Sequence, residues 1–263
     1  MLRWPFVLFC VLFFQFSFGQ LRFEKLVIEP GQTFEMQNTD ILVVDTLIVK
    51  ENGGIQLNRT KPENYIHATI ARFGKGAFIN GHGKSGEGGR DGVNGITLGG
   101  PCKDGLAGKS GTSGSDGGNG VSLYLYFDKL EVAEQLLIDI SGGNGGDGGK
   151  GGNGGGGSPG TRLCAGGNGA PGANGGSGGD AGNGGNLNIS CKSCPDLRTW
   201  LGTSIKVRNY RGNAGLGGAG GLGGSPGLGV ANLPNEDGKP GSSGKRGNDG
   251  AEGNDGAIDF EKT

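Results

Sequence analysis

Alternation of apolar and polar residues predicts short β-strands in two parts of the chain. Between residues 21 and 80, runs such as ILVVDTLIVK (41–50) and YIHATIARF (65–73) are rich in β-branched and aromatic residues and are separated by Gly and polar turns. Further along, VSLYLYF (121–127) alternates in the same way and precedes a turn expected at Asp128–Lys129. We expect residues 20–80 to form a β-solenoid or sandwich-like base, which strands within 121–141, 186–211 and 257–261 extend.

The N-terminus has a different pattern, an apolar run that predicts a secretory signal peptide. The only charged residue in MLRWPFVLFCVLFFQFSFG is Arg3, and small Ser17 and Gly19 occupy the −3 and −1 positions of a cut before Gln20. The run is too short and wrongly flanked for a membrane-spanning helix, so a membrane anchor is the weaker alternative. We expect residues 1–19 to be removed and the protein to be secreted or held at the cell surface, without spanning a membrane.

Between the strands, glycine recurs at every third residue. This period covers six tracts, at 83–95, 105–120, 142–160, 166–178, 212–227 and 238–256. Three residues per turn is the repeat of polyproline II, so every third residue lies on one edge of such a rod. Collagen shares the period, but these tracts are short, interrupted and poor in proline. The period therefore predicts ordered rods, with a collagen-like trimer and disorder as alternatives.

The residues between the glycines are also sorted. In 142–157 glycine fills two of the three edges, leaving one column of Asn144, Asp147, Lys150 and Asn153, and tract 166–185 is similar. Tract 212–227 has nearly two glycine edges, and we expect its Leu216, Ala219 and Leu222 column to pack inward. A rod that is bare on two edges can be approached from two sides. We therefore expect these tracts inside a bundle and the other three at its rim.

The connections between the rods alternate between polar turns and strands. Tracts 83–95, 142–160 and 212–227 lead into short polar turns, whereas the other tracts lead into the strands. Rods would thus run up from the β-layer, turn at the far end and run back down. The predicted fold is all-β and irregular: a base (20–80) continuous with a Gly-rich part (81–263) containing a bundle of six antiparallel polyglycine II helices.

Cysteine placement predicts two disulfides. Removal of residues 1–19 takes away Cys10 and leaves four cysteines, an even number that favours disulfides in an exported chain. Cys102 and Cys164 both fall in far-end turns, and Cys191 and Cys194 both fall in one return at the β end, so we expect Cys102–Cys164 and Cys191–Cys194 among the three possible pairings. A zinc site at Cys191 and Cys194 is the alternative, but no second pair of ligands accompanies it.

With rods such as GGNGGDGGKGG (142–152), residues 83–256 resemble the polyglycine II bundle proteins. That group includes snow flea antifreeze protein, the distal adhesins of T-even-type phage tail fibres and the glycine-rich ectodomain of anaplastic lymphoma kinase. The resemblance rests on period and column pattern, not on a sequence-specific motif. It implies hydrogen bonds between the backbone amides of neighbouring rods, and it says little about function.

The charge balance argues against one class of function, nucleic-acid binding. Glycine accounts for 64 of 263 residues, and loss of Arg3 changes the formal net charge from −1 to −2. A chain without a net basic charge has no electrostatic attraction for phosphate backbones, so we expect no nucleic-acid partner.

Catalytic and metal motifs are weak. GGSPG at 156–160 and 223–227 fits G-x-S-x-G by chance in a Gly-rich chain, and the P-loop-like Gly-Lys-Ser sites at 83–85 and 108–110 lack the first glycine. GGNGGDGGK resembles a calcium-binding repeat but has Gly149 in place of the apolar eighth residue. His67 fits one face of a strand. We expect no enzyme, cofactor or metal.

The expected function is that of a structural or adhesive scaffold that presents its far-end loops to a surface glycan or protein. The candidate binding residues lie in or next to 96–104, 161–165 and 228–237: Lys103, Asp104, Arg162, Leu163, Leu228, Leu233, Pro234, Glu236 and Asp237. Ice binding is the alternative, because it requires a flat and regularly spaced face. The sequons at Asn58 and Asn188 would carry glycans only in a eukaryotic source.

Overall fold

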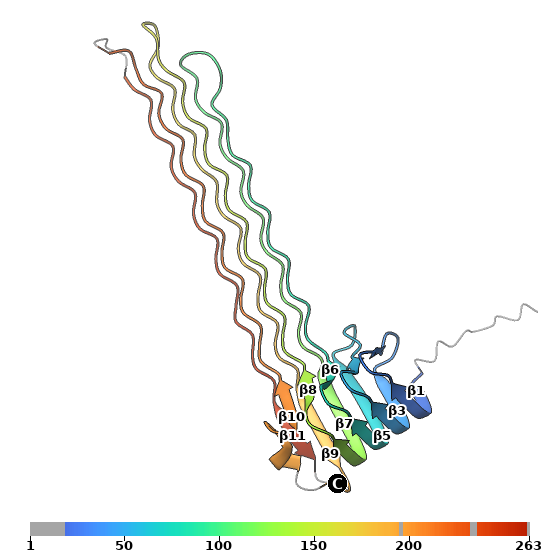
Figure 1. Ribbon diagram of the computed structural model, residues 1–263. Coiled ribbons are helices and arrows are strands. Elements are labelled where there is room, and N and C mark those ends of the chain that lie inside the picture. The colour runs from blue at the N-terminus through green and yellow to red at the C-terminus, as the bar shows by residue number, and fades with distance from the viewer. Residues whose placement is uncertain (1–18, 195–196, 232–235, 262–263) are drawn as a thin grey trace, which may run out of the picture.

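The computed structural model describes residues 19–194, 197–231 and 236–261, which form two sheets of parallel β-strands joined by long Gly-rich excursions (Figure 1). One sheet has six strands, in the order β1-β3-β5-β7-β9-β11, and the other has five, in the order β10-β8-β6-β4-β2. The strands are β1 (Leu21–Ile28), β2 (Thr33–Glu35), β3 (Ile41–Val49), β4 (Gly54–Gln56), β5 (Glu63–Phe73), β6 (Ala77–Asn80), β7 (Ser122–Val132), β8 (Leu136–Asp139), β9 (Leu187–Cys191), β10 (Ile205–Arg208) and β11 (Ile258–Glu261). The prediction of a β-rich fold is confirmed.

Successive strands alternate between the two sheets, so the chain winds as a two-sided solenoid. In the six-stranded sheet Leu42 pairs with Ile66, which pairs with Leu125, which pairs with Ile189. These side chains point between the sheets and are almost fully buried. Strand alternation places the intervening polar residues on the outside. The core therefore lies between the sheets and draws on strands from both sides of residue 80.

The strand β7 runs through the turn expected at Asp128–Lys129. Its partner β5 is also eleven residues long, and the pairing continues from Glu63 with Ser122 to Phe73 with Val132. Asp128 forms an ion pair of 2.6 Å with Lys192, which follows β9. Polar residues that face outward are compatible with a β-strand, and β5 extends as far as β7 and pairs with it throughout. The predicted turn at Asp128–Lys129 is therefore wrong, and the chain turns after Val132.

The Gly-rich tracts are inserted at one corner of the solenoid, where the chain passes from the five-stranded to the six-stranded sheet. That corner is short in the first two coils, at 36–40 and 57–62. In the next three it becomes hairpin 1 (81–121), hairpin 2 (140–186) and hairpin 3 (209–257), which extend far beyond the sheets (Figure 1). Each hairpin has an outgoing arm and a returning arm. The outgoing arms are 83–96, 141–160 and 210–229, and the returning arms are 103–120, 165–185 and 238–256.

Backbone hydrogen bonds join the arms at every third residue. Within a layer, Gly86 N of hairpin 1 donates to Asn144 O of hairpin 2 (2.7 Å), and Gly148 N donates to Leu216 O of hairpin 3 (2.8 Å). Between layers, Gly146 N donates to Ser115 O (2.9 Å). The bonds satisfy the backbone groups of segments that have no hydrogen bonds within themselves.

The predicted bundle of six antiparallel polyglycine II helices is wrong. The described residues of the arms form no α-helix or 3-10 helix, and the one helix in the described chain is the short 3-10 helix η1 (Leu197–Trp200) outside them. The three outgoing arms run parallel to one another, as do the three returning arms, and only the contacts between layers are antiparallel. The reason is the parallel sheets, because every outgoing arm leaves the same sheet in the same direction.

The interior position predicted for residues 142–157 is confirmed. This arm exchanges hydrogen bonds with both neighbouring outgoing arms and with returning arms 1 and 2. A Cβ atom at Gly146 would lie 2.0 Å from Glu87 O, and one at Gly145 would lie 2.1 Å from Gly179 O. Both edges are therefore in backbone contact, which explains why both are glycine.

Polar columns on the arms of hairpins 1 and 2 form a second hydrogen-bond ladder to the next arm. Asp147 Oδ1 accepts from Leu216 N (2.8 Å), while the adjacent Gly148 N donates to Leu216 O, so the pair clamps one residue of the next arm. The same arrangement holds at Asn153 with Leu222 and at Asn183 with Asn254. The repeated Asn-Gly and Asp-Gly dipeptides therefore join neighbouring arms. The sequence analysis missed this role, although the dipeptides recur along the tracts.

The opposite corner of the solenoid is short until the last coil, where 192–204 contains η1. Leu197 and Trp200 of this segment pack partly buried against the core, and the Arg198 guanidinium lies 5.7 Å from the Phe260 ring centroid. This segment also contains Cys194, which is disulfide-bonded to Cys191. The segment therefore covers part of the core where the solenoid ends.

Candidate binding surface at the hairpin tips

The tips of the three hairpins lie side by side at the end of the molecule remote from the sheets (Figure 1). They contain residues 97–102, 161–164 and 230–237, of which 232–235 lie outside the described residues. Leu233 and Pro234, two of the predicted binding residues, belong to that undescribed stretch. The remaining predicted tip residues can be placed.

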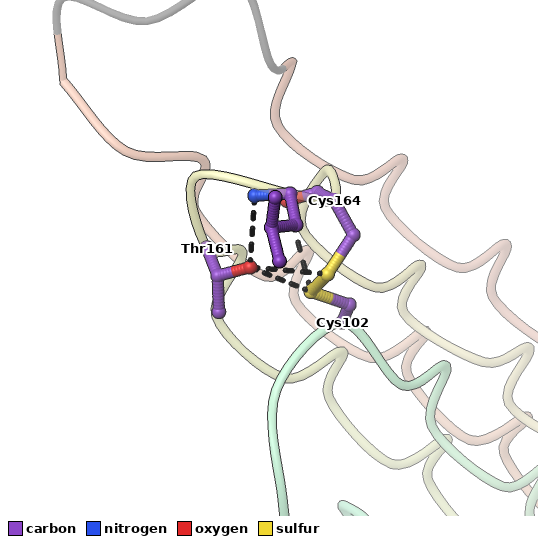
Figure 2. The surroundings of a disulfide bond; sticks show 4 residues. Cys102, Thr161 and Cys164 are labelled. Carbon is purple, nitrogen blue, oxygen red and sulfur yellow. Dashed lines mark hydrogen bonds between the residues drawn. A yellow bond between two sulfur atoms is a disulfide. The ribbon is translucent and has the colours of Figure 1, made fainter.

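A disulfide between Cys102 and Cys164 joins the tips of hairpins 1 and 2, with the two Cα atoms 6.0 Å apart (Figure 2). Cys102 N donates to Pro159 O (2.8 Å), and Ser158 N donates to Lys103 O (2.8 Å) on either side of it. The pairings Cys102–Cys164 and Cys191–Cys194 are both confirmed. Because disulfides persist in oxidising compartments, they are consistent with an extracellular protein.

A tight turn follows the disulfide at the tip of hairpin 2. Thr161 N donates to Cys164 O (2.9 Å), the Thr161 hydroxyl accepts from Leu163 N (3.2 Å), and its oxygen lies 3.3 Å from Cys164 Sγ (Figure 2). The turn leaves Arg162 exposed and Leu163 95% exposed. The apolar side chain of Leu163 is therefore exposed to solvent on a turn whose backbone is fixed by hydrogen bonds.

Hairpin 3 contributes Leu228 beside this turn. Its carbonyl accepts from Gly160 N (2.8 Å), and its side chain is 66% exposed. Asp237 Oδ1 accepts from Gly229 N (2.6 Å), which closes the base of the third tip, and Glu236 O accepts from Gly166 N (3.0 Å). Arg162, Leu163 and Leu228 are therefore exposed on neighbouring tips, and we call them the tip surface.

Two predicted tip residues, Asp104 and Lys103, form hydrogen bonds that hold the arms together. Asp104 Oδ1 accepts from Asn168 N (2.5 Å), so its carboxylate belongs to the polar ladder. Lys103 contributes its carbonyl to Ser158, and its side chain is exposed near Gly100. The sequence alone did not separate these roles.

Exposed apolar side chains also occur where the sequence analysis did not expect them. Leu216 and Leu222 are 58% and 66% exposed, so the expectation that they pack inward is wrong. Their column is the one that faces outward in the other arms of the same layer. Near the tip of hairpin 1, Ile96 (59%) and Leu106 (47%) are exposed as neighbours, with Leu106 N donating to Ile96 O (2.9 Å).

The Ser, His and Asp side chains nearest to a catalytic arrangement lie at the other end, where hairpins 1 and 2 leave the sheets. Ser141 Oγ donates to Asp139 Oδ1 (2.5 Å), and His82 Nδ1 lies 2.9 Å from Ser141 Oγ. In a nucleophilic triad the histidine stands between serine and carboxylate and removes the serine proton. Here the serine lies between the histidine and the carboxylate, so the order of a triad is not reproduced.

The other candidate chemical groups are placed in structural settings. Ser158, the serine of the first GGSPG, is buried and donates to Leu98 O (2.5 Å). His67 is exposed on β5, two residues after Tyr65 and on the same face of the strand. The Tyr65 ring stacks on Tyr124 of β7. A hydrogen bond to Glu63 raises the pKa of Tyr65 to about 12. The described residues contain no cluster of three metal-binding side chains and no helix long and apolar enough to cross a membrane.

The two sequons lie in the β part of the molecule. Asn58 is buried and its Nδ2 donates to Thr39 O (3.2 Å), so the amide is engaged inside the corner loop. Asn188 lies half-buried on β9. Of the predicted signal peptide, residues 1–18 lie outside the described residues.

No protein-family model and no curated protein matches the chain. A solved structure, the nine polyproline type II helical bundle antifreeze protein of the springtail Granisotoma rainieri, is 21% identical over 64% of this chain and 94% of that chain, with a TM-score of 0.11. The expected resemblance to the polyglycine II bundle proteins is corrected by the fold itself, because the regular structure here is a pair of parallel sheets.

Proposed function

We propose that this protein is an exported, non-enzymatic scaffold that binds a surface glycan or protein through the tip surface. The observation that carries the proposal is the exposure of Leu163 (95%) and Leu228 (66%) on neighbouring tips that a backbone hydrogen bond joins at the far end of the arms. Exposed apolar side chains on a rigid support lose little conformational entropy on binding and gain the full benefit of burial. Arg162 adds a cation beside them.

The arms supply the rigidity that such a surface needs. Their backbone bonds repeat along the whole length, and the Asn and Asp clamps join each arm to the next in its layer. Loops carry specificity where a scaffold holds them. In support of an extracellular role, the disulfide that braces the tips needs an oxidising compartment.

The test is binding by the double variant Leu163→Ser and Leu228→Ser. We expect adhesion to cells or to arrayed glycans to fall at least tenfold, because each buried leucine is worth about 1.5–3 kcal/mol. The matched control is Leu216→Ser with Leu222→Ser, two leucines that are 58% and 66% exposed on the same arm as Leu228 but away from the tips. Equal binding by the tip variant and the unaltered protein would refute the tip surface, and loss only in the control would move the site to the arm.

Ice binding is the second candidate, and the observation that favours it is the regular outer face of the returning arms. Asn119, Asn183 and Asn254 form one row across the three returning arms and are joined by hydrogen bonds. Similar rows follow at every third residue along the arms. The same face contains Asp116, Asp180, Lys239 and Lys245, whose charges hold water in their own geometry. We therefore expect round, unshaped ice crystals and no thermal hysteresis in a nanolitre osmometer. Faceted crystals would instead indicate that this face binds ice.

A further inference from the structure

A pocket lies at the foot of hairpin 1, at the opposite end of the arms from the tip surface. It has a volume of about 460 Å³ and is formed by residues 59–62 of the corner loop and by the ends of neighbouring arms that lie next to the sheets. We call it the junction pocket. Its lining comprises Arg59, Thr60, Lys61, Pro62, Gly83, Lys84, Gly118, Asn119, Gly120, Val121, Ser122, Asn183 and Gly184.

The pocket is a consequence of the change in corner length between coils. The corner 57–62 stops at the level of the sheets, whereas the next corner continues as hairpin 1. The side of the hairpin therefore rises as a wall beside the short loop. Ser122 N donates to Pro62 O (2.9 Å), which fixes the end of the loop against the foot of that wall.

The loop that forms the floor is held in place from below. Asn58 N donates to Asn64 Oδ1 (2.7 Å), Asn58 Nδ2 donates to Thr39 O (3.2 Å), and both asparagines are buried. The Thr60 hydroxyl donates to Asn58 Oδ1 (2.7 Å). Arg59 and Lys61 are thus carried by a preformed loop, which reduces the entropy lost when a ligand binds.

The charged residues that line the pocket are all basic. They are Arg59 and Lys61 on the loop and Lys84 on the wall, and the lining contains no acidic residue. The Arg59 guanidinium lies 3.5 Å from the neutral Gln56 Oε1. Glu87 lies 3.8 Å from Lys84, with both side chains more than four-fifths exposed, so solvent screens this ion pair strongly.

Amide groups complete the lining. Asn119 Oδ1 accepts from Asn183 N (2.8 Å), and Asn183 Oδ1 accepts from Asn254 N (2.7 Å). The oxygens are used by the ladder, which leaves the Nδ2 groups as hydrogen-bond donors. Cations next to amide donors and glycine backbone match a ligand that combines an anionic group with hydroxyls.

We propose that the junction pocket binds an acidic sugar residue of a polysaccharide, with its carboxylate or sulfate on Arg59 and Lys84 and its hydroxyls on Asn119 and Asn183. An arginine fork pairs with either group through two hydrogen bonds. The volume exceeds that of a single inorganic anion, and the pocket opens to solvent, so a polymer can enter and leave. This inference does not depend on the tip surface, which lies at the other end of the arms.

The experiment measures the affinity of the purified protein for polygalacturonate and for heparin, with neutral dextran and sodium sulfate as reference ligands. The test variant is Arg59→Gln with Lys84→Gln. The control is Arg90→Gln with Lys109→Gln, which removes the same charge from hairpin 1 outside the pocket lining. We expect the test variant to bind an acidic polymer about tenfold more weakly or worse, since charge-assisted hydrogen bonds are lost, and the control to change less than twofold.

Four results would overturn the proposal. Equal weakening in both variants would indicate diffuse attraction to surface charge. Failure of the unaltered protein to bind either acidic polymer, or equal binding of dextran, would exclude an acidic-sugar site. Full competition by sulfate at the same affinity as the polymers would reduce the pocket to a small-anion site. If the Leu163→Ser and Leu228→Ser variant still binds these polymers, binding at the junction pocket is independent of adhesion through the tip surface.

Discussion

Gly89→Ala should destabilise the protein by about 3 kcal/mol, whereas Gly88→Ala should leave its stability unchanged or slightly higher. A Cβ atom at Gly89 would lie 2.0 Å from Thr112 O and 2.7 Å from Gly149 N. Both are backbone atoms that cannot rotate away, so the arms must separate. The separation also weakens the bond from Gly89 N to Asp147 O (2.7 Å).

The adjacent glycine is a matched control. A Cβ atom at Gly88 would meet Asp147 O at 3.7 Å, an ordinary contact, and alanine restricts the unfolded chain. Denaturant midpoints of the two variants, with hydrogen exchange at Gly149 and Gly152 as a local probe, check the difference. If the two variants unfold at the same denaturant concentration, the arms are not in the close backbone contact described.

The sequence was informative where side chains alternate or glycine is sorted. The run 41–50 anticipated β3 (Ile41–Val49), because apolar residues at alternate positions indicate one buried face. The glycine columns anticipated that residues 142–157 lie inside, since only an arm approached on several sides needs two bare edges. The disulfides followed from which turns lie at the same end of the arms.

The sequence did not disclose how the arms pair. A three-residue glycine period is equally compatible with parallel and antiparallel neighbours, because glycine carries no side chain that specifies direction. Direction comes from the solenoid, in which all outgoing arms continue one sheet and all returning arms lead into the other. The same lack of register information explains why Leu216 was assigned to the interior although it faces solvent.

The candidate site was predicted only in outline. The sequence brought three loops to one end, but the braced turn at Thr161 depends on contacts with Cys164 and Leu163 that spacing alone does not specify. The junction pocket depends on a short corner next to a long one. That contrast becomes visible only when the strands have been assigned to two sheets.

Removing the tip disulfide with Cys102→Ser and Cys164→Ser should destabilise the protein by about 4 kcal/mol. The two cysteines are separated by 62 residues, and the chain-entropy relation gives about that value for a loop of this length. Cys191→Ser with Cys194→Ser should cost only about 1.6 kcal/mol by the same relation, because that separation is 3. Denaturant unfolding of the two double variants, compared with the oxidised protein, measures both.

The same variants separate stability from the function of the tips. Without the disulfide, hairpins 1 and 2 still share the bonds from Cys102 N to Pro159 O and from Ser158 N to Lys103 O, so the arms should remain paired below the tip. We expect the Thr161 turn to exchange its amide protons faster and tip-dependent adhesion to weaken, since the turn loses its anchor at Cys164. A loss of 1 kcal/mol or less, with unchanged exchange of the Thr161 amide, would show that the backbone bonds alone hold the tips together.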